Sequence, residues 1–412
     1  MTGADDTLAI RELERLASES GLDLKGGTIR RSSSRFCLGV EHGDYNGTEL
    51  FGVGTDRFIW FAFKANDIGR VRLLSGNFPG DGVISFATGH VPAPKSPEIA
   101  DTWARFPYGI DHVLSREGFD LSRGIDGVVY GNIPGGGMSR SASLTLNLIL
   151  SLLDANNIEI DDPMRIAILA QAVENDYIGS PCGLLDQIMI LFAREGMGTH
   201  YRPSDSSIAY VPLGDDAIDF RIVGLDTGTS RPGLEKSTYR LRRAECDELV
   251  EMLGGEFAIS CLADVRDEKT YDRILEKYRG THPDHCDRLG YIFHAQRRFG
   301  TMLEAWKAGD VETVGRMFRE DGIGLRDQYR ISGPELETMC DLARTVPGVL
   351  GERMLGGGDK GAAGALVRAD SVAALEEAVR TGYPRSHPAY ADRFAVHVCK
   401  VVDGITVLDQ HL

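Results

Sequence analysis

Apolar and polar residues are arranged along the chain in patterns that predict both strands and helices. Short β-rich runs at 36–38, 51–54, 58–64 and 127–130 look like strands. Residues 141–153 (SASLTLNLILSLL) are apolar nearly all round, which a surface helix cannot tolerate, so this segment predicts a helix inside the protein. Strand-like and helical runs alternate without an internal repeat or a simple βαβ order, so we expect an α+β fold.

The segment that follows carries helix boundaries. An Asp-Pro pair at 162–163 supplies an N-cap and a proline at the first helical position, which predicts a helix to about Asp176. The turn GSPCG at 179–183 interrupts this helix, and another is predicted at 184–194. Asp186 would lie in its first turn, where the helix dipole favours an ionised carboxylate.

The length and net charge of the chain indicate how many lobes it has and which partners it disfavours. With 412 residues, 42% hydrophobic and 26% charged, the chain is longer than one core usually serves, so we expect one lobe over 1–205 and a second over 206–412. The net charge of −16 disfavours nucleic acid or an anionic membrane as a partner, because either needs a clustered cationic face. An acidic surface fits a monomer and is also compatible with a dimer.

Cysteine usage and the start of the chain bear on the compartment. The seven cysteines show no short repeated pairing, so we expect free thiols in a reducing compartment, of which the cytoplasm is the simplest. The start (MTGADDTLAIRELERLASES) is acidic and helical in period, so we expect no signal peptide. No apolar run approaches the length that spans a bilayer.

A glycine-rich segment, GGGMSRSA at 135–142, lies between the predicted strand GVVY and the buried helix. Its glycines let backbone N–H groups approach an anion at a helix N-terminus, which is the geometry of a phosphate-binding loop. The segment has neither the Gly-Lys-Ser/Thr ending of a Walker loop nor the context of a dinucleotide fingerprint. A triple glycine is also a common tight turn, so this segment alone does not decide the function.

Read with three other segments, the loop resembles the galactokinase branch of the GHMP kinases, with the motifs in the family's order. The segments are RFCLGVEHGDYNG at 35–47, ENDYIGSPCGLLDQ at 174–187 and RMLGGGDKGA at 353–362, supported by WARFPYGIDHVL at 103–114 and KSTYRLRR at 236–243. The resemblance implies a two-lobed GHMP kinase fold, with an N-terminal lobe like ribosomal protein S5, a C-terminal ferredoxin-like lobe that lets the final strand return to the first, and the active site between them. It also implies transfer of the γ-phosphoryl of ATP, with Mg²⁺, to the anomeric C1 hydroxyl of a galactose-like sugar.

The resemblance further implies a role for individual residues. Asp186 would be the general base at the C1 hydroxyl, with Arg35 beside it to favour the ionised carboxylate and to stabilise charge on the transferred group. Ser141 and Glu174 would hold Mg²⁺. The sugar would contact Glu41, His42, Asp44, Gly183 and Tyr239. The residues expected to bind ATP are Gly135, Gly136, Gly137, Ser139, Arg140, Ser141 and Ala142.

The sequence departs from the family pattern at several positions. Ser-Ser-Ser at 32–34 replaces Ala-Pro-Gly, the phosphate loop is one residue short with Arg140 for its middle serine, and Asp359-Lys360 replaces Phe-Gly. Arg140 and Lys360 would add positive charge near phosphates, which would tighten ATP or serve a different donor or an acidic substrate group.

Two rival functions stay open at this point. The segment 383–408 also resembles galacturonokinases, but Glu41 would repel a C6 carboxylate, so we rank a neutral hexose first and a uronate or modified sugar second. The altered phosphate loop is compatible with a catalytically silent sugar sensor. The presence together of Arg35, Ser141, Glu174 and Asp186 argues against a sensor, since a sensor needs no base.

Plainer interpretations exist for some of these residues. Asp186 could be only a first-turn helix acid, and Tyr239 a half-buried surface aromatic. The segment HPDHC at 282–286 resembles a metal cluster, but no fourth ligand follows at zinc-like spacing, so we expect an ordinary polar loop there.

Overall fold

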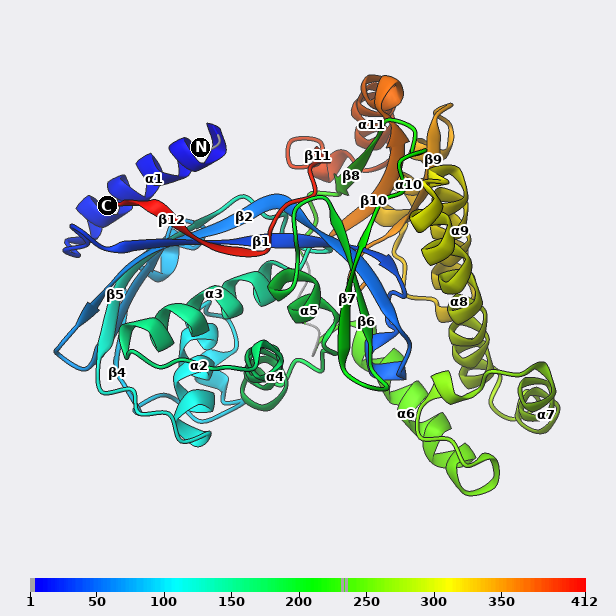
Figure 1. The fold of residues 1–412 in the computed structure, drawn as a ribbon, viewed down its shortest axis with the longest axis horizontal. Helices are drawn as coiled ribbons and strands as arrows, with labels where there is room; N and C mark the ends of the chain where they lie inside the picture. Colours follow the sequence, from blue (N-terminus) through cyan, green and yellow to red (C-terminus); the bar gives the residue numbers. More distant parts are fainter. Residues whose placement is uncertain (1–3, 231–232, 234–235) are drawn as a thin grey trace.

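Two β-sheets with helices packed against them make up the computed structural model, which describes residues 4–230, 233 and 236–412 (Figure 1). Within those residues the larger sheet has eight strands and the smaller has four. The larger sheet contains β1 (Thr28–Gly39), β2 (Leu50–Asn66), β3 (Arg70–Ser75), β4 (Ile84–Ala87), β5 (Gly124–Gly131), β6 (Met197–Arg202), β7 (Ser207–Pro212) and β12 (Ile405–His411). The smaller contains β8 (Phe220–Asp226), β9 (Val349–Met354), β10 (Ala362–Arg368) and β11 (Ala395–Cys399).

Helices cover both sheets. Those of the first half are α1 (Ala4–Ser20), α2 (Arg105–Arg116), α3 (Arg140–Ala155), α4 (Pro163–Ala172) and α5 (Leu185–Leu191). Those of the second half are α6 (Thr238–Phe257), α7 (Glu268–Tyr278), α8 (Pro283–Ala308), α9 (Val311–Gly324), α10 (Pro334–Arg344) and α11 (Val372–Ser386). This mixture confirms the predicted α+β class. Within the described residues, no helix is both long and apolar enough to cross a bilayer.

The larger sheet is buried on both faces, which explains why β2 reads as one continuous apolar run. Ile59, Phe61 and Phe63 pack into the core that includes α3, whereas Trp60 and its neighbours pack against α1 on the opposite face. Alternate residues of a strand point to opposite faces, so both sets must be apolar here. Figure 1 shows α1 on one side of this sheet and α2, α3 and α4 on the other.

Strand β1 is longer than its apolar pattern predicted. It begins at Thr28 and includes the serines at 32–34, which are fully buried. The Ser32 hydroxyl lies 2.8 Å from that of Ser143 on α3 and accepts a hydrogen bond from Asn147 at 3.1 Å. A polar interior interface between strand and helix therefore replaces the apolar contact that a hydrophobic pattern would reveal.

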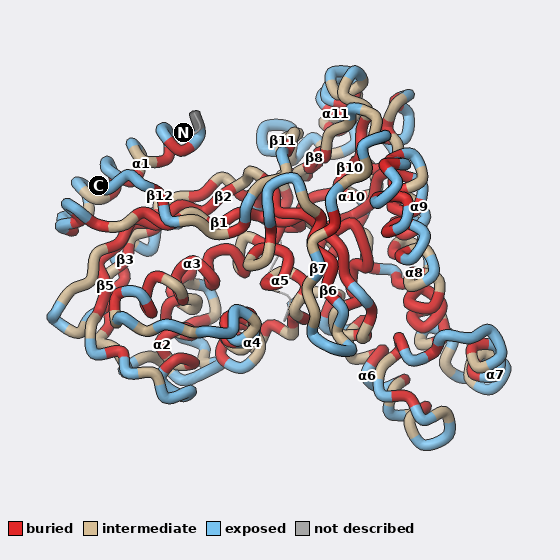
Figure 2. Tube along the Cα trace, viewed as in Figure 1, coloured by how far each residue is buried: buried red, intermediate tan, exposed pale blue. Residues whose placement is uncertain are grey.

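The helices around the glycine-rich loop follow the prediction closely. Helix α3 spans the expected buried segment and is largely buried along its length (Figure 2). Asp162 caps α4 by accepting a hydrogen bond from the Met164 N–H at 2.9 Å, and a π-helical turn over Val173–Ile178 continues α4. Helix α5 has Asp186 in its first turn but ends at Leu191, short of the predicted end near 194.

The second half of the chain builds the smaller antiparallel sheet, in the order β11-β8-β10-β9, and then returns to the first. Its last strand, β12, pairs with β1, so the two halves share one sheet. The predicted division at 205/206 falls in the turn between β6 and β7. The expectation of a polar loop at 282–286 is wrong, because α8 begins at Pro283, and proline at the first helical position was the signal for it.

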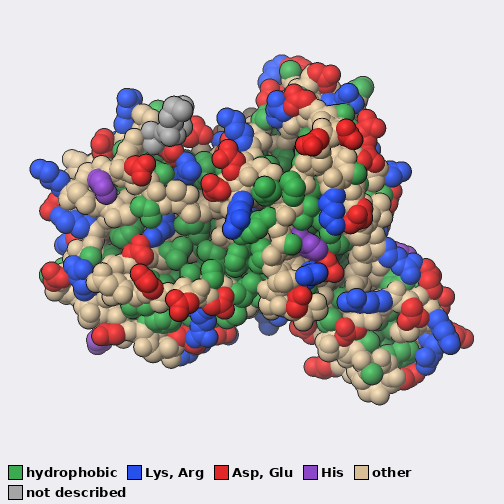
Figure 3. Space-filling view, viewed as in Figure 1, with side chains coloured by type: hydrophobic (Ala, Val, Ile, Leu, Met, Phe, Trp, Pro, Cys, Tyr) green, Lys and Arg blue, Asp and Glu red, His purple; other side chains and the backbone are tan. Residues whose placement is uncertain are grey.

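Side chains of both charges cover the face of the molecule drawn in Figure 3. Lys and Arg are interspersed there with Asp and Glu, around a stretch of hydrophobic surface near the middle of the view.

Candidate active site

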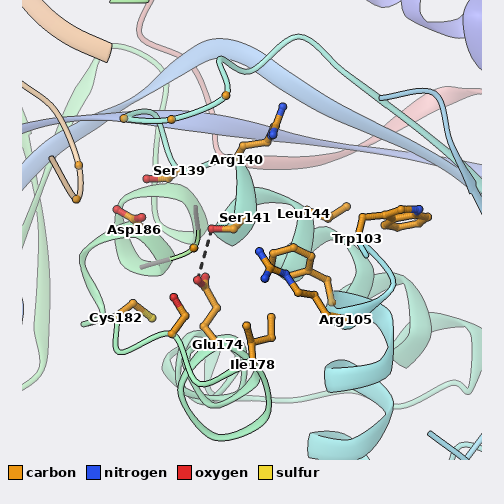
Figure 4. A pocket seen from close by; sticks show the side chains of 18 of the residues that line it. Trp103, Arg105, Ser139, Arg140, Ser141, Leu144, Glu174, Ile178, Cys182 and Asp186 are labelled. Carbon is orange, nitrogen blue, oxygen red and sulfur yellow. Dashed lines mark hydrogen bonds between the residues drawn. The ribbon is translucent and has the colours of Figure 1, made fainter. Parts of the chain in front are cut away.

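A cavity of about 480 Å³ collects almost all of the residues predicted to form the site. Its wall contains Arg35, Glu41, His42, Asp44, Gly135, Gly136, Gly137, Ser139, Arg140, Ser141, Glu174, Gly183, Asp186 and Tyr239. Ala142 is fully buried in the first turn of α3 and is outside this wall. Segments far apart in the sequence thus meet at one hollow (Figure 4).

Arg35 on β1 and Asp186 on α5 form an ion pair in the wall of the cavity. The Arg35 Nε and Nη2 atoms donate to the same carboxylate oxygen of Asp186 at 2.8 and 2.7 Å. Burial would lower the pKa of Arg35, but Asp186 and Glu41 outweigh it and hold that pKa above its usual value. The Arg35 side chain is 2% exposed and that of Asp186 is 33% exposed, so a permanent cation orients a carboxylate that remains open to the cavity.

The glycine-rich loop lies directly beside this pair. Arg35 Nη1 donates to the Gly137 carbonyl oxygen at 2.8 Å. Gly137 has a φ of 85°, and a Cβ added to it would lie 2.8 Å from the backbone nitrogen of Ala362, so only glycine fits between the two segments. The loop ends at the N-terminus of α3, where backbone N–H groups lack helical partners and attract anions.

Ser141 and Glu174 face each other on the floor of the cavity. The Ser141 hydroxyl lies 3.5 Å from a Glu174 carboxylate oxygen, and Figure 4 shows the two side chains pointing toward one another. Within the described residues, no group of three or more His, Cys, Asp or Glu is arranged to hold a metal. Two oxygen donors beside a phosphate loop suit Mg²⁺, which takes one or two protein oxygens and fills its shell with phosphate and water.

The opposite end of the site is built around Asp44. One of its carboxylate oxygens accepts from the Tyr45 N–H at 3.1 Å and the other from the Leu185 N–H at 3.2 Å. A Cβ added to Gly183 would lie 2.0 Å from Asp44 Oδ2, so any side chain at this position would displace the Asp44 carboxylate or the loop. Burial raises the pKa of Asp44, and these two N–H groups oppose the rise.

Aromatic rings close the wall next to Asp44. The ring centroids of His42 and Tyr239 are 5.2 Å apart, and His42 Nδ1 lies 2.9 Å from the Tyr45 hydroxyl. That hydroxyl is in turn 2.7 Å from the hydroxyl of Tyr329. Tyr239 is only 5% exposed, so it is a wall residue and not a half-buried surface aromatic.

Comparison with known proteins identifies the family. Models of the GHMP kinases N terminal domain and of the GHMP kinases C terminal match residues 107–194 and 302–385. The galactokinase of Limosilactobacillus fermentum is 32% identical over 383 residues, which cover 92% of this chain and 95% of that protein. That of Streptococcus mutans is 31% identical over 380 residues, covering 92% and 94%. The chain belongs to the galactokinase family of GHMP kinases.

Solved structures agree with this assignment. The crystal structure of Lactococcus lactis galactokinase complexed with galactose has a TM-score of 0.88 and 28% identity, covering 97% of this chain and 100% of that one. Methanococcus jannaschii mevalonate kinase has a TM-score of 0.64 at 14% identity, covering 91% and 98%, and shares the fold. The predicted membership and the two-lobed GHMP fold are confirmed, and a kinase of this family uses ATP as a substrate.

One departure from the galactokinase pattern has a structural explanation. Asp359, where the family has Phe, accepts a hydrogen bond from the Thr238 N–H at 2.8 Å and so caps the N-terminus of α6. Tyr239 is the next residue of that helix. Asp359 therefore stabilises the helical turn that carries a wall residue, while its neighbour Lys360 is outside the cavity wall.

Sequence reasoning missed an aromatic end of the cavity in this galactokinase-family chain. Phe78, Trp103 and Phe106 line the wall, and Figure 4 shows Trp103 on the side away from Asp186. The Arg140 guanidinium lies 5.4 Å from the centroid of the Phe78 ring. These aromatics are scattered through segments whose sequence is typical of loops and surface helices. The resemblance of residues 103–114 to the family's helix after the nucleotide-side loop was the signal that could have found Trp103 and Phe106.

Proposed function

We propose that this enzyme transfers the γ-phosphoryl of ATP to the C1 hydroxyl of galactose, giving the sugar 1-phosphate and ADP. The observation that carries the proposal is the Arg35–Asp186 pair, which lies where the phosphate loop meets the Asp44 end of the cavity. Galactokinases among the relatives, and the Lactococcus lactis enzyme complexed with galactose, support the choice of sugar.

The arrangement divides the work among the chain's own residues. The open carboxylate of Asp186 accepts the proton of the C1 hydroxyl as its oxygen bonds to the γ-phosphorus and the bond to the ADP oxygen breaks. Arg35 orients the Asp186 carboxylate and also donates to the Gly137 carbonyl oxygen, which places its cationic group where negative charge on the transferred group would develop. The phosphate loop binds the anionic nucleotide through the backbone N–H groups at the start of α3.

Ser141 and Glu174 would hold Mg²⁺, which when bound would neutralise phosphate charge. The ATP contacts proposed from the family pattern are Gly135, Gly136, Gly137, Ser139, Arg140, Ser141 and Ala142. With all seven cysteines free among the described residues, we also propose a cytoplasmic location.

The sugar would contact Asp44, Gly183, Tyr239, His42 and Glu41. Asp44 is held by two backbone N–H groups, so its carboxylate is preorganised to accept hydrogen bonds from sugar hydroxyls. Glu41, Asp44 and Asp186 all reach the cavity, which disfavours a sugar that carries a C6 carboxylate.

The test is a panel of sugars with Mg-ATP, in which release of ADP is measured. Galactose should be turned over with the highest kcat/KM, and galacturonate should be at least about tenfold poorer, as an unpaired charge near like charges costs on the order of 1–3 kcal/mol. Binding of galactose without any ADP from any member of the panel would refute the kinase proposal in favour of a sugar sensor.

Two variants separate the proposed roles. Asp186→Asn should lower kcat by about 10²–10⁴-fold with nearly unchanged galactose binding, because the amide cannot accept the hydroxyl proton. Asp44→Ala should weaken galactose binding itself, measured by calorimetry. The opposite pattern would contradict the assignment of base and binding group.

A further inference from the structure

A row of alternately charged side chains leads from the active site into the second half of the protein. Its links are Asp186–Arg35, Arg35–Glu41, Glu41–Arg353, Arg353–Asp321 and Asp321–Arg298, with N···O distances of 2.7, 3.5, 3.1, 2.5 and 3.1 Å. The four middle side chains are at most 4% exposed. Buried charges at such distances depend on their partners, because removal of one leaves its neighbour unpaired in the interior.

Arg353, at the end of β9, is the centre of this row. Its Nη1 atom donates to Asp321, while Nη2 donates to Glu41 at 3.1 Å and to the Cys37 carbonyl oxygen at 2.8 Å. Its guanidinium carbon lies 4.5 Å from the centroid of the Phe318 ring. The planar guanidinium of Arg353 donates to three acceptors in different parts of the chain, and the single ammonium group of a lysine cannot reproduce this arrangement.

Glu41 is the residue that Arg353 most directly affects. Burial raises the pKa of Glu41, and Arg35, Arg353 and the Gly356 N–H oppose that rise. The backbone of Glu41 is also fixed, since its carbonyl oxygen accepts from the Tyr291 hydroxyl at 2.8 Å. The charged and titratable groups around Glu41 are Arg35 and Cys37 on β1, Arg353 on β9, Asp186 on α5, Tyr291 on α8 and Asp321 on α9.

Ionised Glu41 joins the parts of the site to one another. It pairs with Arg35, which orients Asp186, and it lies near the N–H of Gly356, which lowers the pKa of Glu41. A Cβ added to Gly356 would lie 3.1 Å from the Cα of Gly137, so this glycine packs directly on the phosphate loop. If Glu41 became neutral, Arg35 would lose one counter-ion and the Gly356 segment would lose a nearby negative charge.

We propose that Arg353 is a positioning residue for the phosphoryl transfer, which pairs with Glu41 and thereby holds Arg35 and the Gly356 segment in their working positions. The inference rests on the proposed sugar kinase activity. It gives the arginine of the third glycine segment a specific task, although Arg353 is itself absent from the cavity wall.

The pH profile of kcat/KM for galactose tests this role. In Arg353→Gln, Glu41 loses an opposite charge within 4 Å, so its pKa should rise and the acid limb of the profile should move up by about one pH unit or more. The ratio of wild-type to variant kcat/KM should then be about tenfold larger on the acid side of the limb than on the alkaline plateau. Arg353→Lys should give a smaller shift.

Two further measurements separate positioning from a structural defect. Arg344→Gln is the control. Arg344 on α10 is more exposed than Arg353, but it pairs at 2.9 Å with a fully buried carboxylate, that of Glu352 on β9, away from the cavity, so the pH profile of this variant should not move. In a Glu41→Gln background, Arg353→Gln should cause no further shift, since the group that titrates is gone. This double variant also removes both charges and is expected to fold where the single variant fails.

An acid limb that stays in place in Arg353→Gln, or in Arg353→Lys if the glutamine variant does not fold, would overturn the proposal. So would an equal shift in the Glu41→Gln background. Absence of any galactose phosphorylation by the wild type would instead refute the proposed function, so the two failures are distinguishable.

Discussion

The contact between Gly183 and Asp44 gives the sharpest prediction from geometry alone. In Gly183→Ala the new methyl group would lie 2.0 Å from Asp44 Oδ2 and 2.2 Å from its Cγ, whereas real contacts of this kind are essentially never under 3.0 Å. The carboxylate or the loop must therefore move by about 1 Å or more, which breaks the 3.2 Å hydrogen bond from the Leu185 N–H. A hydrogen bond to a charged group contributes about 1.5–3 kcal/mol.

If Asp44 binds the sugar, that displacement should appear in the KM for galactose. The expected increase is about 10- to 100-fold, with a smaller effect on kcat and an unchanged KM for ATP, because each tenfold corresponds to about 1.4 kcal/mol. The assay is ADP release against galactose concentration at saturating ATP. Adding Gly183→Ala to Asp44→Ala should not raise the KM for galactose any further, because the carboxylate that the new methyl group would displace is absent.

Gly300→Ala on α8 is the matched control, because an added Cβ there meets nothing within 4 Å. It should leave both KM values unchanged. A wild-type KM for galactose in Gly183→Ala would refute the reasoning, as would an equal increase in the control.

Three other changes test separate parts of the structure. Asp359→Ala removes the cap on the Thr238 N–H, so it should cost about 0.5–2 kcal/mol of stability and raise the KM for galactose; an unchanged unfolding midpoint would contradict the capping role. Burial raises the pKa of Asp111 to about 6, above its unfolded value of 3.8, so the stability associated with its protonated form is lost as pH rises through 6. The stability of Asp111→Asn relative to the wild type should therefore increase by about 1–2 kcal/mol as the pH rises from 5 to 8, measured by thermal unfolding. A stability difference that does not grow with pH would contradict this direction of the pKa shift. Arg140→Ser should raise the KM for ATP about 3- to 30-fold with less effect on kcat, since Arg140 is a half-buried cation in the cavity wall that forms no ion pair within the described residues; an unchanged KM would remove it from the ATP site.

Much of the site could be predicted from the sequence because its motifs are short and continuous. Residues 35–47 place Arg35, Glu41 and Asp44 on one strand and the turn that follows it, and the segment around Asp186 marks a helix start. The nearly continuous apolar pattern also identified the buried helix α3. Local sequence patterns are enough to predict a site residue where the same short segment determines both the secondary structure and the functional side chain.

Contacts between distant segments left no such signal. The strand through the serines at 32–34 is stabilised by the Ser143 hydroxyl and the Asn147 amide of α3, so its polar sequence concealed it. In the sequence Arg353 is only one position of a glycine-rich motif. The fold shows that its side chain reaches the Cys37 carbonyl oxygen on β1 and pairs with Glu41. Phe78 and Trp103 belong to separate segments that converge through the sheet topology, which a linear pattern does not encode.

The position of the transferred phosphoryl group is the most direct test of the account. The protein should be incubated with Mg-ATP and galactose, and the product examined by phosphorus and carbon nuclear magnetic resonance, with Asp186→Asn in parallel. The account predicts phosphorus coupled to C1 of the sugar, one ADP for each sugar phosphate, and almost no product from the variant. Phosphorus on another hydroxyl, or full product from Asp186→Asn, would contradict it.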